Sequence, residues 1–253
     1  MIFYFSGTGN SEHIARLIGE RTGEEVIDIA KCLKESRLSF TLKKRERLGF
    51  VYPIYFWGLP SIVIDFVKAA EFTFYGKQFT YSVATCGATT GAADRNLSEL
   101  LKKKHIPMHA TFAIKMVDNY TPIFDVSDKE KNALTNAKAS DNISDMLFLV
   151  DNRIGGYYNH YVGLWPVSKA TKVAYDLSRR TAFFKVSNDC IGCGKCAENC
   201  PCTAIEMVDG KPSWTKKKCT FCLGCVNKCP ANAISAGGMT RKHGQYVYIE
   251  EDK

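Results

Sequence analysis

The sequence predicts an α/β protein, with an open, doubly wound parallel sheet followed by a small α+β domain built around cysteines. Over the first 150 residues, short apolar runs alternate with stretches of helical periodicity, which is typical of parallel strands joined by crossover helices. Two four-cysteine runs of equal spacing follow from Cys190. The length of 253 residues allows one medium-sized domain and one small domain.

Five apolar runs predict the strands of the sheet, at residues 2–5, 25–29, 48–52, 79–85 and 110–117. Helical patterns at 11–21, 61–70, 92–104 and 128–150 supply most of the crossovers, so helices should cover both faces of the sheet. Ser127 is the expected N-cap of the last helix. Residues 153–186 are interpreted as a partly helical connection, with a helix over 166–180.

The two cysteine runs lie 29 residues apart, and a proline follows each of them. This spacing is the signature of a two-cluster bacterial ferredoxin, in which the fourth cysteine of each run serves the other 4Fe–4S cluster. We therefore assign Cys190, Cys193, Cys196 and Cys229 to cluster 1, and Cys219, Cys222, Cys225 and Cys200 to cluster 2. Structural zinc also uses Cys-x2-Cys pairs. Zinc leaves the third cysteine step of each run and both prolines unexplained.

The remaining cysteines and the first residues of the chain fit a protein of the reducing cytoplasm. Only Cys32, Cys86 and Cys202 lie outside the two runs, and they are scattered. We expect no targeting segment and no membrane span, since no stretch approaches the roughly 18 apolar residues that a spanning helix needs. The small domain, 187–253, could barely bury a core of its own, so the clusters should act as its core.

The loop after the first apolar run suits a phosphate group. It opens a helix, whose first N–H groups and positive dipole end favour an anion. Glu12 replaces the third glycine of a dinucleotide fingerprint, and no Gly-Lys-Ser/Thr sequence follows. Four short polar side chains surround two glycines: Ser6, Thr8, Asn10 and Ser11 around Gly7 and Gly9. That set suits a terminal monophosphate, although an N-capping turn explains the loop alone equally well.

Two further loops follow the third and fourth apolar runs. One is aromatic (Pro53, Ile54, Tyr55, Phe56, Trp57 and Gly58) and the other is small and glycine-rich (Thr85, Cys86, Gly87 and, further on, Gly91). Loops at the carboxyl ends of neighbouring parallel strands converge on one crevice. Together the three loops suit a flat isoalloxazine ring with a phosphorylated tail. Aromatic residues are more often core, which we favour for Phe56, whereas Tyr55 and Trp57 are expected at the ring.

On these motifs the chain resembles a known family. Ser6 to Ser11, Pro53 to Gly58 and Thr85 to Gly87 look like the three FMN-binding loops of flavodoxin-like domains, and the cysteine runs look like a clostridial-type ferredoxin. The fusion resembles the flavodoxin–ferredoxin proteins of anaerobic bacteria and archaea, called ferrodoxins. The resemblance implies a five-stranded sheet of order 2-1-3-4-5 in residues 1–152, and FMN and two 4Fe–4S clusters as cofactors.

The charge of the chain bears on its partners. The net charge is +8, with basic runs at 43–45, 102–104 and 216–218. Such runs are usually solvated faces; the functional alternative is docking of an acidic redox partner, such as a ferredoxin, a flavodoxin or an oxidoreductase. A homodimer is also open. We expect no nucleic-acid binding, because the lysine runs are not interleaved with aromatic residues.

These features predict an electron relay between the two clusters and FMN in anaerobic metabolism, with no catalytic acid or base. Two alternatives stay open: an FMN-dependent reductase of a small organic acceptor, and an electron-input subunit of a larger redox complex. Cys202 is interpreted either as a small core residue or as a spare thiol able to replace a lost cluster ligand. Cys86 either packs in the core or touches the flavin ring.

Overall fold

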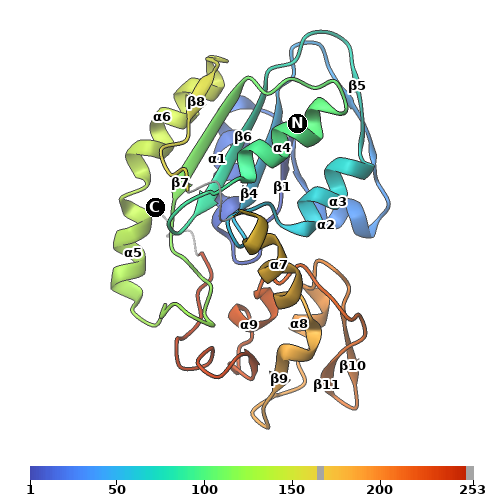
Figure 1. Ribbon diagram of the computed structural model, residues 1–253, viewed down its shortest axis with the longest axis vertical. Coiled ribbons are helices and arrows are strands. Elements are labelled where there is room, and N and C mark those ends of the chain that lie inside the picture. The colour runs from blue at the N-terminus through green and yellow to red at the C-terminus, as the bar shows by residue number, and fades with distance from the viewer. Residues whose placement is uncertain (164–167, 249–253) are drawn as a thin grey trace.

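The computed structural model describes residues 1–163 and 168–248 and contains a central sheet of six parallel strands (Figure 1). In chain order these are β1 (Ile2–Tyr4), β2 (Val26–Asp28), β4 (Leu48–Pro53), β6 (Thr80–Cys86), β7 (Ala110–Lys115) and β8 (Gly156–Tyr158). The spatial order is β2-β1-β4-β6-β7-β8. The five predicted strands and their 2-1-3-4-5 order are thus confirmed.

The predicted number of strands is wrong by one. β8 pairs in parallel with β7 at the edge of the sheet and lies in the segment 153–186, which was expected to be only a connection. Its Gly-Tyr-Tyr sequence interrupts the helical pattern without forming an apolar run, so periodicity gave no signal. A second, two-stranded parallel sheet, of β3 (Ser39–Leu42) and β5 (Glu71–Phe74), was also not predicted.

Helices cover both faces of the central sheet, as expected from the crossovers (Figure 1). They are α1 (Asn10–Thr22), α2 (Ile29–Lys34), α3 (Ser61–Ala69), α4 (Ala93–Lys102), α5 (Lys129–Ala137) and α6 (Ser140–Asp151). Successive strand residues alternate between two cores: Phe3 and Phe50 pack with α2, α3 and α4, whereas Ile2 and Val51 pack with α1 and α6. This alternation explains why the strands read as continuous apolar runs.

The helix predicted over 128–150 is two helices. α5 has no buried residue, whereas α6 buries Met146 and Val150 against the sheet. The chain turns at Lys138 and Ala139, so only the second half packs on the core. The N-cap of α5 is Asp128, whose carboxylate accepts the N–H of Lys131, and not the expected Ser127.

The cluster domain contains two copies of one small unit. Each cysteine run contains a four-residue helix, α8 (Lys195–Glu198) in the first and α9 (Gly224–Asn227) in the second. Two antiparallel pairs complete the domain: β9 (Phe184–Val186) with β12 (Ile234–Ala236), and β10 (Ile205–Val208) with β11 (Lys211–Trp214). The domain lies against one end of the central sheet (Figure 1).

Helix α7 (Ser168–Ser178) lies between the two domains (Figure 1). The buried Tyr175 donates its hydroxyl to the carbonyl oxygen of Thr220 at 2.7 Å and accepts the N–H of Ser61 at 3.1 Å. The helix expected over 166–180 is therefore present from Ser168, and residues 164–167 lie outside the described part. None of the helices in the described ranges has the length and apolar content needed to cross a bilayer.

Candidate cofactor sites

A cavity lies at the carboxyl ends of β1, β4, β6 and β7, where the strand order reverses between β1 and β4. This is the position at which open α/β sheets bind their ligands. The cavity measures about 240 Å³. It is lined by most of the predicted flavin-site residues: Ser6, Thr8, Asn10, Ser11, Pro53, Ile54, Tyr55, Phe56, Trp57, Thr85, Cys86 and Gly87. Gly9, Gly58 and Gly91 do not line it but shape the loops that do.

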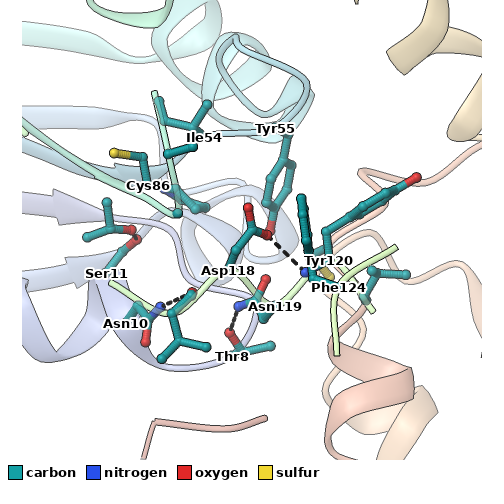
Figure 2. Close-up of a pocket in the computed structure, with 18 of the residues that line it drawn as sticks. Thr8, Asn10, Ser11, Ile54, Tyr55, Cys86, Asp118, Asn119, Tyr120 and Phe124 are labelled. Atoms are coloured by element: carbon teal, nitrogen blue, oxygen red, sulfur yellow. Dashed lines mark hydrogen bonds between the residues drawn. The ribbon is translucent and has the colours of Figure 1, made fainter. Parts of the chain in front are cut away.

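We call the loop at residues 6–11, after β1, the phosphate loop. Its polar side chains form hydrogen bonds with other parts of the protein (Figure 2). Ser11 and Thr85 share a hydrogen bond of 2.8 Å between their hydroxyls, and the Asn10 amide donates to the carbonyl oxygen of Val117 at 3.2 Å. Thr8 accepts a hydrogen bond from Asn119. The backbone N–H groups of the first turn of α1 have no intrahelical acceptor. Unpaired N–H groups at a helix N-terminus beside fixed hydroxyls are an arrangement that favours an anion.

The aromatic loop forms a tight turn. Tyr55 and Gly58 exchange two backbone hydrogen bonds of 3.0 Å, and Phe56 and Trp57 between them have φ angles of 48° and 58°. Two successive bulky residues in the left-handed region are strained, a feature that clusters at ligand sites. The turn points the two rings in different directions. Trp57 lies at the cavity mouth, 48% exposed, whereas Phe56 stacks on Tyr175 with ring centroids 5.5 Å apart.

The glycine-rich loop closes one wall of the cavity. Thr89 lines the cavity, but its buried Oγ1 atom lies next to Gly163, where a Cβ atom would be 2.9 Å from it. The thiol of Cys86 is also buried, which raises its pKa to about 12, so it is a neutral wall of the cavity.

Two further segments line the cavity that the sequence did not point to. The first is the loop after β7, including Val117, Asp118, Asn119, Tyr120, Ile123 and Phe124 (Figure 2). It follows a predicted strand at its carboxyl end, so the rule that found the other loops also applies to it. Asp118 is the only carboxylate that this loop contributes to the lining of the cavity. Burial raises the pKa of Asp118, and its Oδ1 atom accepts the N–H of Tyr120 at 3.1 Å.

The second segment comes from the cluster domain. Phe221, Cys222 and Leu223 line the same cavity as the phosphate loop. A Cβ atom on Gly7 would lie 2.7 Å from the carbonyl oxygen of Cys222, so the two backbones are in direct contact. Sequence patterns carry no signal for a contact between residues this far apart in the chain.

The eight cysteines of the two runs line two smaller cavities. Cys190, Cys193, Cys196 and Cys229 surround one of them, and Cys200, Cys219, Cys222 and Cys225 surround the other. These are the two sets assigned from the spacing, including the cysteine that each run contributes to the opposite site. The repeat extends to the backbone, where Ala204 donates to the sulfur of Cys200 and Ala233 to that of Cys229, both at 3.3 Å.

The cysteines of the cluster 2 cavity are more buried than those of the cluster 1 cavity. Burial raises the pKa of the Cys219 thiol to about 12 and also raises those of Cys222 and Cys225. A buried thiol loses its proton only when a metal ion takes the place of that proton. Thiolates in this buried cavity therefore need iron to stabilise their negative charge. Cys193 in the cluster 1 cavity is exposed by contrast. Cys202 lines the cluster 2 cavity as a fifth thiol and accepts the N–H of Thr220 at 3.2 Å.

Comparison with known proteins agrees with both sites. Residues 1–114 match the family model of a flavodoxin domain, and residues 183–230 match that of a 4Fe-4S dicluster domain. The chain is thus an iron–sulfur flavoprotein. It belongs to the flavodoxin–ferredoxin fusion proteins, with FMN and 4Fe–4S clusters as its cofactors.

Relatives of the cluster domain come from several organisms. The chain is 44% identical over 45 residues to one component of an ion-translocating oxidoreductase complex of Methanosarcina acetivorans, and 36% identical over 58 residues to an uncharacterized polyferredoxin-like protein of Methanocaldococcus jannaschii. These matches cover 18% of this chain and only 17% and 34% of the relatives. A ferredoxin-like protein in the nif region of Sinorhizobium fredii is 38% identical over 55 residues, 19% of this chain and 86% of that protein.

Proposed function

We propose that the protein relays electrons between a one-electron partner and FMN through its two 4Fe–4S clusters. One observation carries the proposal: Cys222 and Leu223 line both the cluster 2 cavity and the flavodoxin-domain cavity. A cluster 2 ligand is thereby a wall of the flavin site. Each cluster exchanges single electrons, whereas FMN can accept one or two. The clusters and FMN together therefore convert one-electron transfer into two-electron transfer.

The burial of the cysteines supports an order along the relay. Cys193 is exposed, and Ile191 beside it is 68% exposed. Cys200 of the cluster 2 set is buried, and that cavity adjoins the flavin site. We therefore propose that a partner exchanges electrons at cluster 1, that cluster 2 is the intermediate, and that FMN is the inner end. The chemistry is that of a reducing cytoplasm, where thiolate-bound clusters persist.

The basic runs do not lie where a partner would approach cluster 1. Lys216 donates its ammonium group to the carbonyl oxygen of Cys202 at 2.6 Å, and Lys218 pairs with Asp176 at 2.6 Å, so both stabilise the cluster domain and its contact with α7. The runs at 43–45 and 102–104 precede β4 and β7, at the amino edge of the sheet. We propose instead that an acidic redox protein docks beside the exposed Lys195, which lines the cluster 1 cavity.

A second candidate function is reduction of a small organic acceptor by FMN. It is favoured by the apolar side chains at the mouth of the flavin cavity, where Trp57, Ile123 and Phe124 are 48%, 65% and 45% exposed. Exposed apolar groups gathered at a cavity mouth favour a flat, apolar acceptor. Association into a homodimer through the same face is a third expectation, tested by sedimentation of the holoprotein.

Rapid mixing of the anaerobic holoprotein with a small reduced ferredoxin tests the relay. The Cys193→Ala variant lacks a cluster 1 ligand, and FMN reduction should slow at least tenfold when both proteins are compared at saturating FMN. Cys32→Ala, which alters a cysteine buried in the flavodoxin-domain core, is the control and should behave as wild type. Equal rates of FMN reduction in Cys193→Ala and wild type would exclude the relay. Rapid FMN reoxidation by a quinone would support the reductase.

A further inference from the structure

The last described residues of the chain return from the cluster domain to the flavodoxin domain. We call residues 244–248 the C-terminal strap. It follows β12 and a turn at 239–243, and it packs beside the phosphate loop and α1. Tyr246 is 6% exposed and forms a small buried cluster with Val117 and Val126 of the flavodoxin domain. Nothing in the spacing of the sequence suggested this return.

The strap is fixed to the cluster domain by its first residues. The side-chain amide of Gln245 donates to the carbonyl oxygens of Val226 and Cys229, at 2.6 and 2.7 Å. The backbone N–H of Tyr246 donates to the side-chain oxygen of Asn227 at 3.0 Å. Val226 and Asn227 belong to α9, and Cys229 lines the cluster 1 cavity. The position of the strap therefore depends on the folded cluster domain.

The next residues of the strap hold the phosphate loop. The Tyr246 hydroxyl donates to the side-chain oxygen of Asn10 at 2.7 Å and accepts the amide of Asn136 at 2.8 Å. The N–H of Tyr248 donates to the carbonyl oxygen of Thr8 at 2.7 Å. A Cβ atom on Gly9 would lie 2.9 Å from that of Tyr248. Thr8, Gly9 and Asn10 are thus all in contact with the strap.

Tyr246 itself contacts both parts of the protein, because its N–H donates to Asn227 of the cluster domain and its hydroxyl donates to Asn10 of the phosphate loop. We propose that the C-terminal strap couples the two cofactor sites, with Tyr246 as a positioning residue that orients Asn10 for FMN phosphate binding. The protein then binds FMN tightly only when its clusters are assembled, and bound FMN in turn slows cluster loss. This reciprocity follows because coupling between two sites acts equally in both directions. The inference rests on the FMN site proposed above.

Removal of the Tyr246 hydroxyl tests whether this residue positions the side chain of Asn10. Tyr246→Phe keeps the buried ring and leaves the oxygen of Asn10 without its donor, so FMN binding to the cluster-loaded full chain should weaken about tenfold. Riboflavin lacks the phosphate, and its affinity should change less than about twofold. Tyr158→Phe is the matched control, because that hydroxyl bonds the nearby carbonyl of Gly155, and both affinities should stay at the wild-type value.

Release of iron into a coloured chelator tests the coupling in the same full-length proteins. In wild type, saturating FMN should slow iron release several-fold and riboflavin should have little effect. In Tyr246→Phe, and in Gln245→Ala, FMN should lose most of this protection. Equal protection by FMN in Tyr246→Phe and wild type, or none in wild type, would overturn the inference. If the wild-type protein failed to bind FMN at all, the proposed function itself would be at fault.

Discussion

Gly7 and Cys222 are packed backbone to backbone, with only 2.7 Å between the carbonyl oxygen of Cys222 and the position of a Cβ atom on Gly7. Gly224 makes the reciprocal approach, since its Cβ position would lie 3.1 Å from the carbonyl oxygen of Gly7. The phosphate loop therefore rests directly on the segment that holds cluster 2. No side chain separates the two cofactor sites at this point.

This contact makes Gly7 intolerant of even a methyl group. We expect Gly7→Ala to push the two loops apart, weakening FMN binding by about 1–3 kcal/mol and altering the spectrum of cluster 2. Gly238→Ala is the control, because its Cβ position has no neighbour within 4 Å. Flavin titration and electron paramagnetic resonance would measure both effects. Wild-type behaviour of Gly7→Ala in both measurements would show that the contact has no role.

The crossed assignment of the fourth cysteines gives a reciprocal prediction. Cys200→Ala should damage the cluster held by Cys219, Cys222 and Cys225, and Cys229→Ala should damage the other cluster. Electron paramagnetic resonance of the reduced proteins distinguishes the two. Because Cys202 lines the same cavity as Cys200, the Cys200/Cys202 double substitution is the stricter test. Damage by each variant to the cluster of its own run would show that the assignment is wrong.

The two central residues of the aromatic turn should differ in effect. Trp57→Ala should weaken FMN binding by about 1 kcal/mol and leave the clusters unchanged, because Trp57 lies at the cavity mouth. Phe56→Ala should in addition lower the free energy of unfolding by about 3 kcal/mol, because Phe56 packs on Tyr175, Tyr120 and Phe221 between the domains. Flavin titration and anaerobic urea denaturation measure the two quantities. Similar effects of both substitutions would contradict this division.

Asp118 predicts a pH dependence of stability. Burial raises its pKa in the folded protein, so the folded state binds the proton more tightly than the unfolded state does. The carboxyl group therefore costs stability as pH rises above its unfolded pKa of about 3.9 and through the raised folded value. Asp118→Asn keeps an acceptor for the N–H of Tyr120 and removes this cost.

The Asp118→Asn variant should thus be more stable than wild type at pH 8, by a margin that shrinks as pH falls through the raised folded pKa toward the unfolded value of about 3.9. Anaerobic urea denaturation of both holoproteins across this range measures the difference. A wild-type protein that is at least as stable as the variant at pH 8 would show that the ionised carboxylate is stabilised in the cavity.

The sequence by itself determined five of the six strands of the central sheet and the expected chemistry of the sites. Buried parallel strands read as apolar runs because both faces of the sheet are covered, and the order of five strands was predicted correctly. Local spacing also predicted which cysteines line each of the two smaller cavities, because cluster ligands lie three residues apart on a short loop. Loops after β1, β4 and β6 were expected to converge because the carboxyl ends of parallel strands share one edge.

Only the tertiary structure decided the edge of the sheet, the break in the last predicted helix of the first domain and the way in which the two domains meet. β8 is a short edge strand without an apolar run, and the break between α5 and α6 depends on which half faces the core. The contact of Gly7 with Cys222, and that of Asn10 with Tyr246, join residues more than 200 positions apart. Such pairs follow no periodicity, because they are fixed by the shapes of two complete surfaces and not by the conformation of either segment alone.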